Sequence, residues 1–176
     1  IDYSKKDYTV SYTGKVPGVY MGRHGFVPAS IATSRVRDVD YILLGNPNFA
    51  DALYGKLSGD TMKPQHTAGK EHESLRAIFL SRGALEAMKM LNIYPDIVVG
   101  NDWMCAPLMA YLNCDAAMYR TDPYFQGVET AGWVHNNGQD YQFKVPVEDY
   151  GVALFWNLGL PGGEYEWFKD PHRADH

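Results

Sequence analysis

The sequence predicts a domain of the α/β class, with a parallel sheet, helical crossovers and some antiparallel strands at an edge. The main reason is the order helix, strand, helix, strand over residues 71–134, with short loops between the elements. A second reason is the short apolar run at residues 97–99, which turn-forming residues bracket on both sides. The third is that residues 1–45 are rich in Tyr, Val and Gly without a helical period, as expected of edge strands.

The N-terminal region is expected to contain at least two strands. Residues 8–12 (YTVSY) alternate between apolar and polar side chains, and residues 39–44 (VDYILL) form a more buried run. A short helix is expected over residues 49–57, within a turn-rich stretch. Glycine and proline residues should divide the first part into hairpins or extended loops: Gly14, Pro17, Gly18, Gly22 and Gly25.

Residues 71–91 form the best-defined predicted helix, because their apolar side chains fall near one stripe and acidic residues occupy the first turn. Pro95 helps to end this helix, and a buried parallel strand is predicted at residues 97–99. The next helix should lie within residues 104–112, with Pro107 in its first turn. A further strand is predicted at residues 130–134.

Composition excludes several classes of protein and site. The 16 basic residues do not cluster and are outnumbered by 21 acidic ones, which argues against nucleic acid as a partner. No apolar run is long enough to cross a membrane, so no membrane partner is expected. Cys105 and Cys114 are too far apart along a helix for a disulfide, which predicts free thiols. No metal site is predicted, because the histidines lack the spacing of metal ligands.

Two polar residues follow predicted strands and are candidates for chemistry. Asp102 comes directly after the strand at 97–99, where a carboxylate can bind a sugar hydroxyl or take part in acid/base work. His135 follows the predicted strand at 130–134, where an imidazole can donate a hydrogen bond to a developing charge or to a substrate hydroxyl. Helix capping is the alternative role for Asp102, and a structural hydrogen bond is the alternative role for His135. If the two strands are parallel neighbours, both side chains emerge at the same edge of the sheet. Such convergence favours a functional site.

A family resemblance adds to this interpretation. The chain resembles the N-terminal catalytic domain of bacterial glycogen synthases and plant starch synthases, which are family 5 glycosyltransferases with the GT-B fold. The match in order and spacing runs from about residue 38 to 176. It is carried by residues 40–47 (DYILLGNP), 53–55 (LYG), 82–86 (RGALE), 94–103 (YPDIVVGNDW), 134–136 (VHN) and 158–161 (LGLP).

The resemblance implies a Rossmann-like three-layer domain and a retaining glucosyltransferase. Such an enzyme moves glucose from ADP-glucose or UDP-glucose to the non-reducing end of an α-1,4-glucan, without a cofactor other than this nucleotide-sugar donor. Asp102 matches an aspartate at the acceptor side, and His135 matches the histidine that contacts the transferred glucose. Asn101, Trp103 and Asn136 are the expected substrate-binding residues. The expected location is the cytoplasm, or the plastid for a plant or algal source.

The sequence also departs from the family pattern. Met104 stands where the family usually has histidine, and residues 137–140 include a short insertion. Residues 1–176 are expected to form one partial N-terminal domain without the second GT-B domain, and such a fragment should be inactive. Two alternatives stay open: a non-catalytic glucan-binding or interaction module derived from this fold, and an unrelated α/β enzyme such as a sugar-phosphate hydrolase. The sequence does not indicate the oligomeric state.

Overall fold

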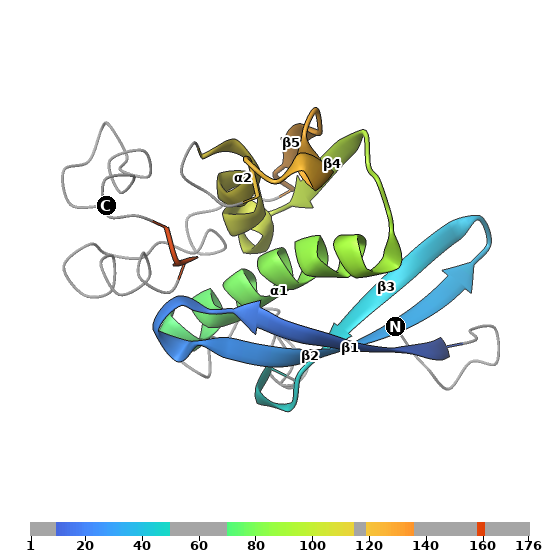
Figure 1. The fold of residues 1–176 in the computed structure, drawn as a ribbon, viewed down its shortest axis with the longest axis horizontal. Coiled ribbons are helices and arrows are strands. Elements are labelled where there is room, and N and C mark those ends of the chain that lie inside the picture. The colour runs from blue at the N-terminus through green and yellow to red at the C-terminus, as the bar shows by residue number, and fades with distance from the viewer. Residues whose placement is uncertain (1–9, 50–69, 115–118, 136–157, 161–176) are drawn as a thin grey trace, which may run out of the picture.

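The computed structural model describes residues 10–49, 70–114, 119–135 and 158–160, and contains two sheets with a long helix between them (Figure 1). The helix α1 contacts strands of the first sheet on one side and α2 on the other. In chain order the strands and α-helices are β1 (Val10–Tyr20), β2 (Phe26–Val36), β3 (Val39–Gly45), α1 (Lys70–Leu91), β4 (Ile97–Asn101), α2 (Ala106–Asn113) and β5 (Glu129–Trp133). Short 3-10 turns are η1 (Gly22–His24), η2 (Pro47–Phe49), η3 (Trp103–Cys105) and η4 (Pro123–Phe125).

The first sheet is antiparallel and has the order β1-β2-β3. Among the described residues it is separate from the parallel pair, so the antiparallel strands form a layer of their own rather than an edge. Gly14, Pro17 and Gly18 lie inside β1 and not in turns, because two register shifts accommodate them in the strand. The strand β2 was not predicted, and the predicted helix at 49–57 lies almost wholly outside the described residues.

The second sheet consists of β4 and β5, which pair in parallel with Asn101 opposite Trp133. This pairing confirms that the strands before Asp102 and His135 are parallel neighbours. The prediction of a fully buried strand is wrong for one face of β4, where Ile97 is 57% exposed and Val99 is 51% exposed. Neighbouring residues of β4 point to opposite faces, and only the face that carries Val98 packs into the core.

The helix α1 confirms the predicted span of residues 71–91, and the apolar side chains of the predicted stripe lie in the core or pack against it. Because it lies between the first sheet and α2, it is buried on several sides, and even polar residues of the helix are inaccessible. Glu73 is 1% exposed and its carboxylate lies 3.5 Å from the guanidinium of Arg76. Glu73 lies in the first turn of α1, as predicted, and forms a buried ion pair there.

A buried arginine joins the layers. Arg82 of α1 is 2% exposed and donates to the backbone carbonyl of Tyr20 at 2.8 Å. Its guanidinium carbon lies 5.0 Å from the ring centroid of Tyr20, 4.7 Å from that of Tyr111 and 5.6 Å from that of Tyr119. Burial raises the pKa of Tyr111 and Tyr119 far above the ordinary range, so both rings stay neutral beside the cation.

Within the described part of the chain, no helix combines the length and the hydropathy that a membrane span requires.

Candidate functional site at the carboxyl ends of β4 and β5

Asp102 and His135 meet where the two parallel strands end. The backbone N–H of Asp102 donates to the carbonyl of Trp133 at 2.9 Å, which extends the pairing of the strands by one bond. The backbone N–H of His135 then donates to the Asp102 carboxylate, with a distance of 2.9 Å to Oδ1. Asp102 precedes η3, but its side chain makes no capping hydrogen bond there. The carboxylate thus binds the neighbouring strand end and does not cap the turn.

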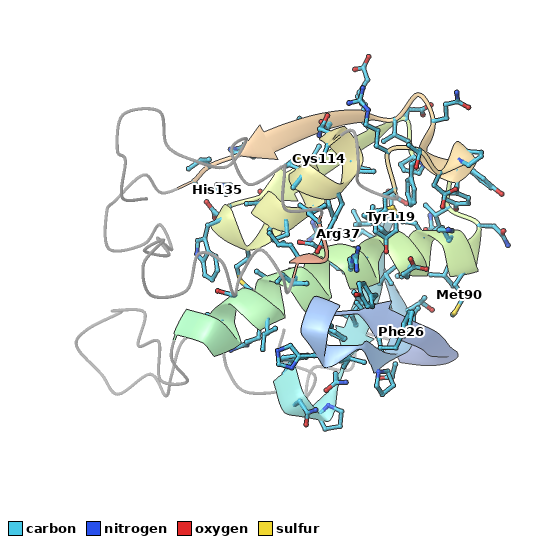
Figure 2. The ribbon with its side chains drawn as sticks, turned by 60° about the vertical axis from the view of Figure 1, so that its left-hand side comes forward. Phe26, Arg37, Met90, Cys114, Tyr119 and His135 are labelled. Carbon is cyan, nitrogen blue, oxygen red and sulfur yellow. The ribbon has the colours of Figure 1, made fainter. Side chains whose placement is uncertain are left out.

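The imidazole of His135 is held by two further side chains. Its Nε2 lies 2.9 Å from Oδ1 of Asn101, and its ring stacks on Trp133 with a centroid distance of 5.3 Å and an interplanar angle of 12°. Asn101 and His135 are exposed, and Trp133 is 61% exposed. Figure 2 shows His135 just beyond the end of β5. The group is therefore open to a ligand from solvent.

The backbone at Asp102 is strained. Its φ of 57° and ψ of −176° lie in a region that residues with a side chain rarely occupy. Such strain is often found at functional sites, where the surrounding structure enforces it. Here the hydrogen bonds to Trp133 and from His135 hold the residue in this conformation.

Cys105 lies close to the site but is not an activated nucleophile. Burial raises the pKa of its thiol, the nearby Asp102 carboxylate raises it further, and a backbone hydrogen bond involving Asn101 acts in the opposite direction. A raised thiol pKa leaves little thiolate near neutral pH. Cys105 and Cys114 flank α2 and are free, as predicted.

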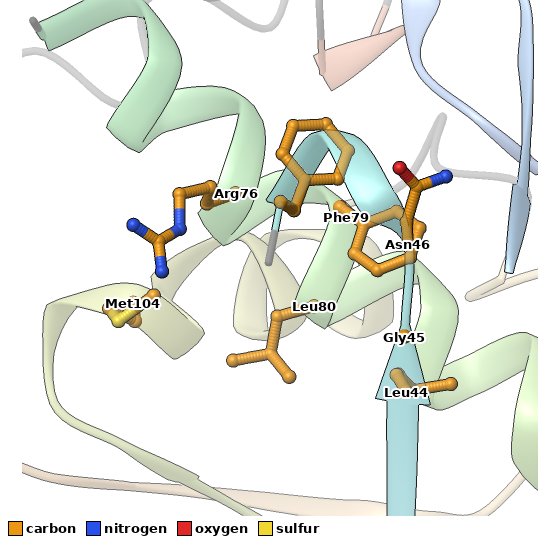
Figure 3. A pocket seen from close by; sticks show the side chains of 8 residues that line it. Leu44, Gly45, Asn46, Arg76, Phe79, Leu80 and Met104 are labelled. Atoms are coloured by element: carbon orange, nitrogen blue, oxygen red, sulfur yellow. The ribbon is translucent and has the colours of Figure 1, made fainter. Parts of the chain in front are cut away.

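A pocket of about 220 Å³ opens beside η3 (Figure 3). It lies between the end of β3, the helix α1 and Met104, which is two residues beyond Asp102. Its charged lining residue is Arg76, which pairs with Glu73. Its other lining residues are mostly apolar: Leu44, Gly45, Asn46, Phe49, Phe79, Leu80 and Met104.

The structure brings together three of the predicted site residues: Asn101, Asp102 and His135. Trp103 begins η3 and is half-buried, while Asn136 lies outside the described residues. Sequence reasoning missed Trp133, although a residue two positions before His135 on an extended segment should share its face. Within the described part of the chain, no group of His, Cys, Asp or Glu side chains has the arrangement of a metal site.

Comparison with known proteins identifies the family. The starch synthase catalytic domain model matches residues 2–174, so the match includes residues 2–37, which precede the family motifs found in the sequence. Glycogen synthase from Elusimicrobium minutum is 34% identical over 157 residues, which cover 87% of this chain and 30% of that protein. Glycogen synthase 1 from Geobacter sulfurreducens is 36% identical over 113 residues, which cover 62% of this chain and 21% of that protein.

A solved structure agrees at the level of the fold. The catalytic domain of Starch Synthase IV from Arabidopsis thaliana, bound to ADP and acarbose, matches with a TM-score of 0.53 and 19% identity. The match covers 94% of this chain and 27% of that chain. This chain therefore spans less than a third of the length of these three proteins. With a family model matched over nearly its whole length, the chain belongs to the starch synthase catalytic domain family of glycosyltransferases.

Proposed function

We propose that this chain forms the acceptor-side part of a retaining glucosyltransferase, which moves glucose from ADP-glucose or UDP-glucose to the non-reducing end of an α-1,4-glucan. Family membership supports the reaction class. The observation that carries the proposal is the meeting of Asp102 and His135 at the carboxyl ends of adjacent parallel strands. Open α/β sheets bind their ligands at this position.

The hydrogen bonds of His135 suggest how it acts. An amide oxygen only accepts, so Nε2 carries a proton toward Asn101 and the neutral ring keeps a lone pair on Nδ1. Among the described residues, no side chain or backbone group bonds Nδ1. This atom can accept a hydrogen bond from a glucose hydroxyl and fix the orientation of the transferred sugar. In its protonated form, the ring would stabilise negative charge on the departing phosphate.

The donor nucleotide is assigned to the remainder of the catalytic domain. The Arabidopsis enzyme that shares this fold was solved with ADP bound, and this chain covers only 27% of it. We propose that residues 1–176 expressed by themselves do not transfer glucose, because they lack most of the donor site. The nucleotide sugar is a substrate, and no further cofactor is needed for the transfer. The proposed location is the cytoplasm or, for a plant or algal source, the plastid.

A glucosyltransfer assay tests the proposal. The polypeptide, as its source organism makes it, is supplied with radiolabelled ADP-glucose or UDP-glucose and with glycogen as the acceptor. His135→Ala should reduce kcat by roughly 100- to 1,000-fold, the usual effect of removing one electrostatic contact to a transition state. Phe26→Leu is the matched control, because Phe26 is an exposed aromatic residue (73%) on the antiparallel sheet. Full activity of His135→Ala would remove the central residue of the proposed site.

A non-catalytic glucan-binding module is the second candidate. Met104 favours it, because this residue lines the pocket where the family usually presents a histidine. Affinity electrophoresis in gels that contain glycogen separates the two functions. A module would be retarded by glycogen yet would transfer no glucose from either donor, whereas a synthase would do both.

A further inference from the structure

Trp133 is placed unusually for a large aromatic residue. Tryptophan normally buries its ring and contributes to the core or to an interface. Trp133 is instead 61% exposed, and its stacking contact in the structure is the imidazole of His135. The near-parallel planes, 12° apart, show that the indole presents its face to that ring.

The backbone around Trp133 fixes the indole in this place. Trp133 is the last residue of β5 and stands opposite Asn101 in the parallel register. Its carbonyl accepts the N–H of Asp102 at 2.9 Å, so the strand end cannot turn freely. His135 lies two residues further along the chain, and its ring shares the face of Trp133. Three groups therefore restrain His135: Asp102 its backbone, Asn101 one ring edge, and Trp133 one ring face.

We propose that Trp133 is a positioning residue for His135 in glucosyl transfer. This inference rests on the proposed function and adds a residue that acts through the imidazole rather than on the substrate. A hydrogen bond to Asn101 alone leaves the ring free to tilt about the line that joins the two residues. The indole face removes this freedom and directs Nδ1 toward the substrate. A misplacement of about 1 Å in a catalytic group can reduce the rate roughly 100-fold, so control of the tilt has a large effect.

Three substitutions, made in the polypeptide as its source organism makes it, distinguish a positioning role of Trp133 from a simple effect of its side-chain size. Trp133→Leu keeps an apolar side chain but removes the aromatic face, whereas Trp133→Phe restores a face. We expect kcat to fall roughly 10- to 100-fold in the leucine variant, with KM within about threefold of wild type, and to recover largely in the phenylalanine variant. In a His135→Ala background, Trp133→Leu should have almost no further effect on kcat, because the two residues act as a unit.

A spectroscopic readout tests the contact without turnover. In NMR spectra, the ring protons of His135 should resonate upfield in wild type, because they lie over the indole, and should move downfield in Trp133→Leu. Phe26→Leu is again the control and should change neither kcat nor these resonances.

The outcomes distinguish the two proposals. If the wild-type polypeptide, as its source organism makes it, transfers no glucose, the proposed function is overturned, and with it the role of Trp133 in transfer. If wild type is active, an unchanged kcat in Trp133→Leu, or an equal loss with and without His135, would overturn the positioning role alone. Unshifted His135 resonances in wild type would also overturn it, because the rings would not be stacked.

Discussion

Replacing Asp102 by glycine should separate the stability of this strand end from its function. The φ of 57° and ψ of −176° lie where non-glycine residues carry roughly 1–3 kcal/mol of strain. Glycine removes this strain, but it lowers the free energy of unfolding by about 0.4–1 kcal/mol, because it gives the unfolded chain more conformational entropy. Both Asp102→Gly and Asp102→Ala lose the hydrogen bond from His135, worth about 0.5–1.5 kcal/mol. The Asp102→Gly variant should therefore be more stable than the Asp102→Ala variant by roughly 1 kcal/mol, which is the difference between the strain energy and the entropy cost.

Urea denaturation measures this order. The free energy of unfolding of Asp102→Gly should be close to that of wild type, and Asp102→Ala should be the less stable variant by about 1 kcal/mol. Glu129, an exposed residue at the start of β5, provides the matched pair, because glycine should be less stable than alanine at an ordinary strand position. In the polypeptide as its source organism makes it, both Asp102 variants should lose glucosyl transfer, since neither accepts the hydrogen bond from the backbone of His135. A glycine variant less stable than the alanine variant would refute the strain argument.

Further predictions concern the hairpin, the core beside the site and a distant ion pair. Arg37→Gly should raise the free energy of unfolding by about 1 kcal/mol, because Arg37 has a φ of 55° at the first position of the two-residue β2–β3 turn. Gly100→Ala should lower it by about 1–3 kcal/mol in thermal or urea unfolding, because the added Cβ would lie 3.0 Å from Cε of Met109 and 3.2 Å from Cβ of Cys105. The pKa of the Asp122 carboxyl is lowered: burial raises it, but the hydrogen bonds from Lys89 and from the backbone of Tyr124 outweigh burial. The partly exposed Lys89–Asp122 pair (2.5 Å) should therefore stabilise the fold by about 0.2–1 kcal/mol at pH values above 3.8, the ordinary pKa of the carboxyl. This stabilisation should disappear as the pH falls through the lower pKa that the carboxyl has in the folded protein. Urea titrations of wild type and Asp122→Asn should differ at pH 7 and converge in acid, and an equal difference at both pH values would contradict the assignment.

The parallel pair and its loops were predictable from local signals. Pro95 ends the region of α1, the apolar run after it is too short for a helix, and Pro107 lies in the first turn of α2. These signals act through backbone sterics, which depend little on the rest of the fold. The convergence of Asp102 and His135 followed from one assumption, namely that consecutive strands separated by a helix are parallel neighbours.

The antiparallel sheet was harder to predict because glycine and proline residues inside a bulged strand cannot be distinguished by sequence from those in turns. Gly14 and Pro17 suggested turns, yet both lie within β1 next to register shifts. Burial of polar side chains also escaped prediction, since Arg82 would ordinarily face solvent. Its position depends on aromatic rings from distant parts of the chain, including Tyr20 and Tyr111. Such long-range packing leaves no periodic signal in the sequence.

The site residues contribute little to the packing of the domain, and this separates their role from that of the core. Asn101, Trp133 and His135 are exposed, and Asp102 is strained, so ordinary stability does not account for these four residues together. The backbone bond from Asp102 to Trp133 needs no particular side chain, whereas the bond from His135 requires an acceptor at position 102. The fold should therefore tolerate many residues at position 102, while the orientation of His135 should not. Backbone strain at a half-buried position, kept where a hydrogen bond from His135 is a stabilising contact of the side chain, is best explained by the chemistry that this residue positions.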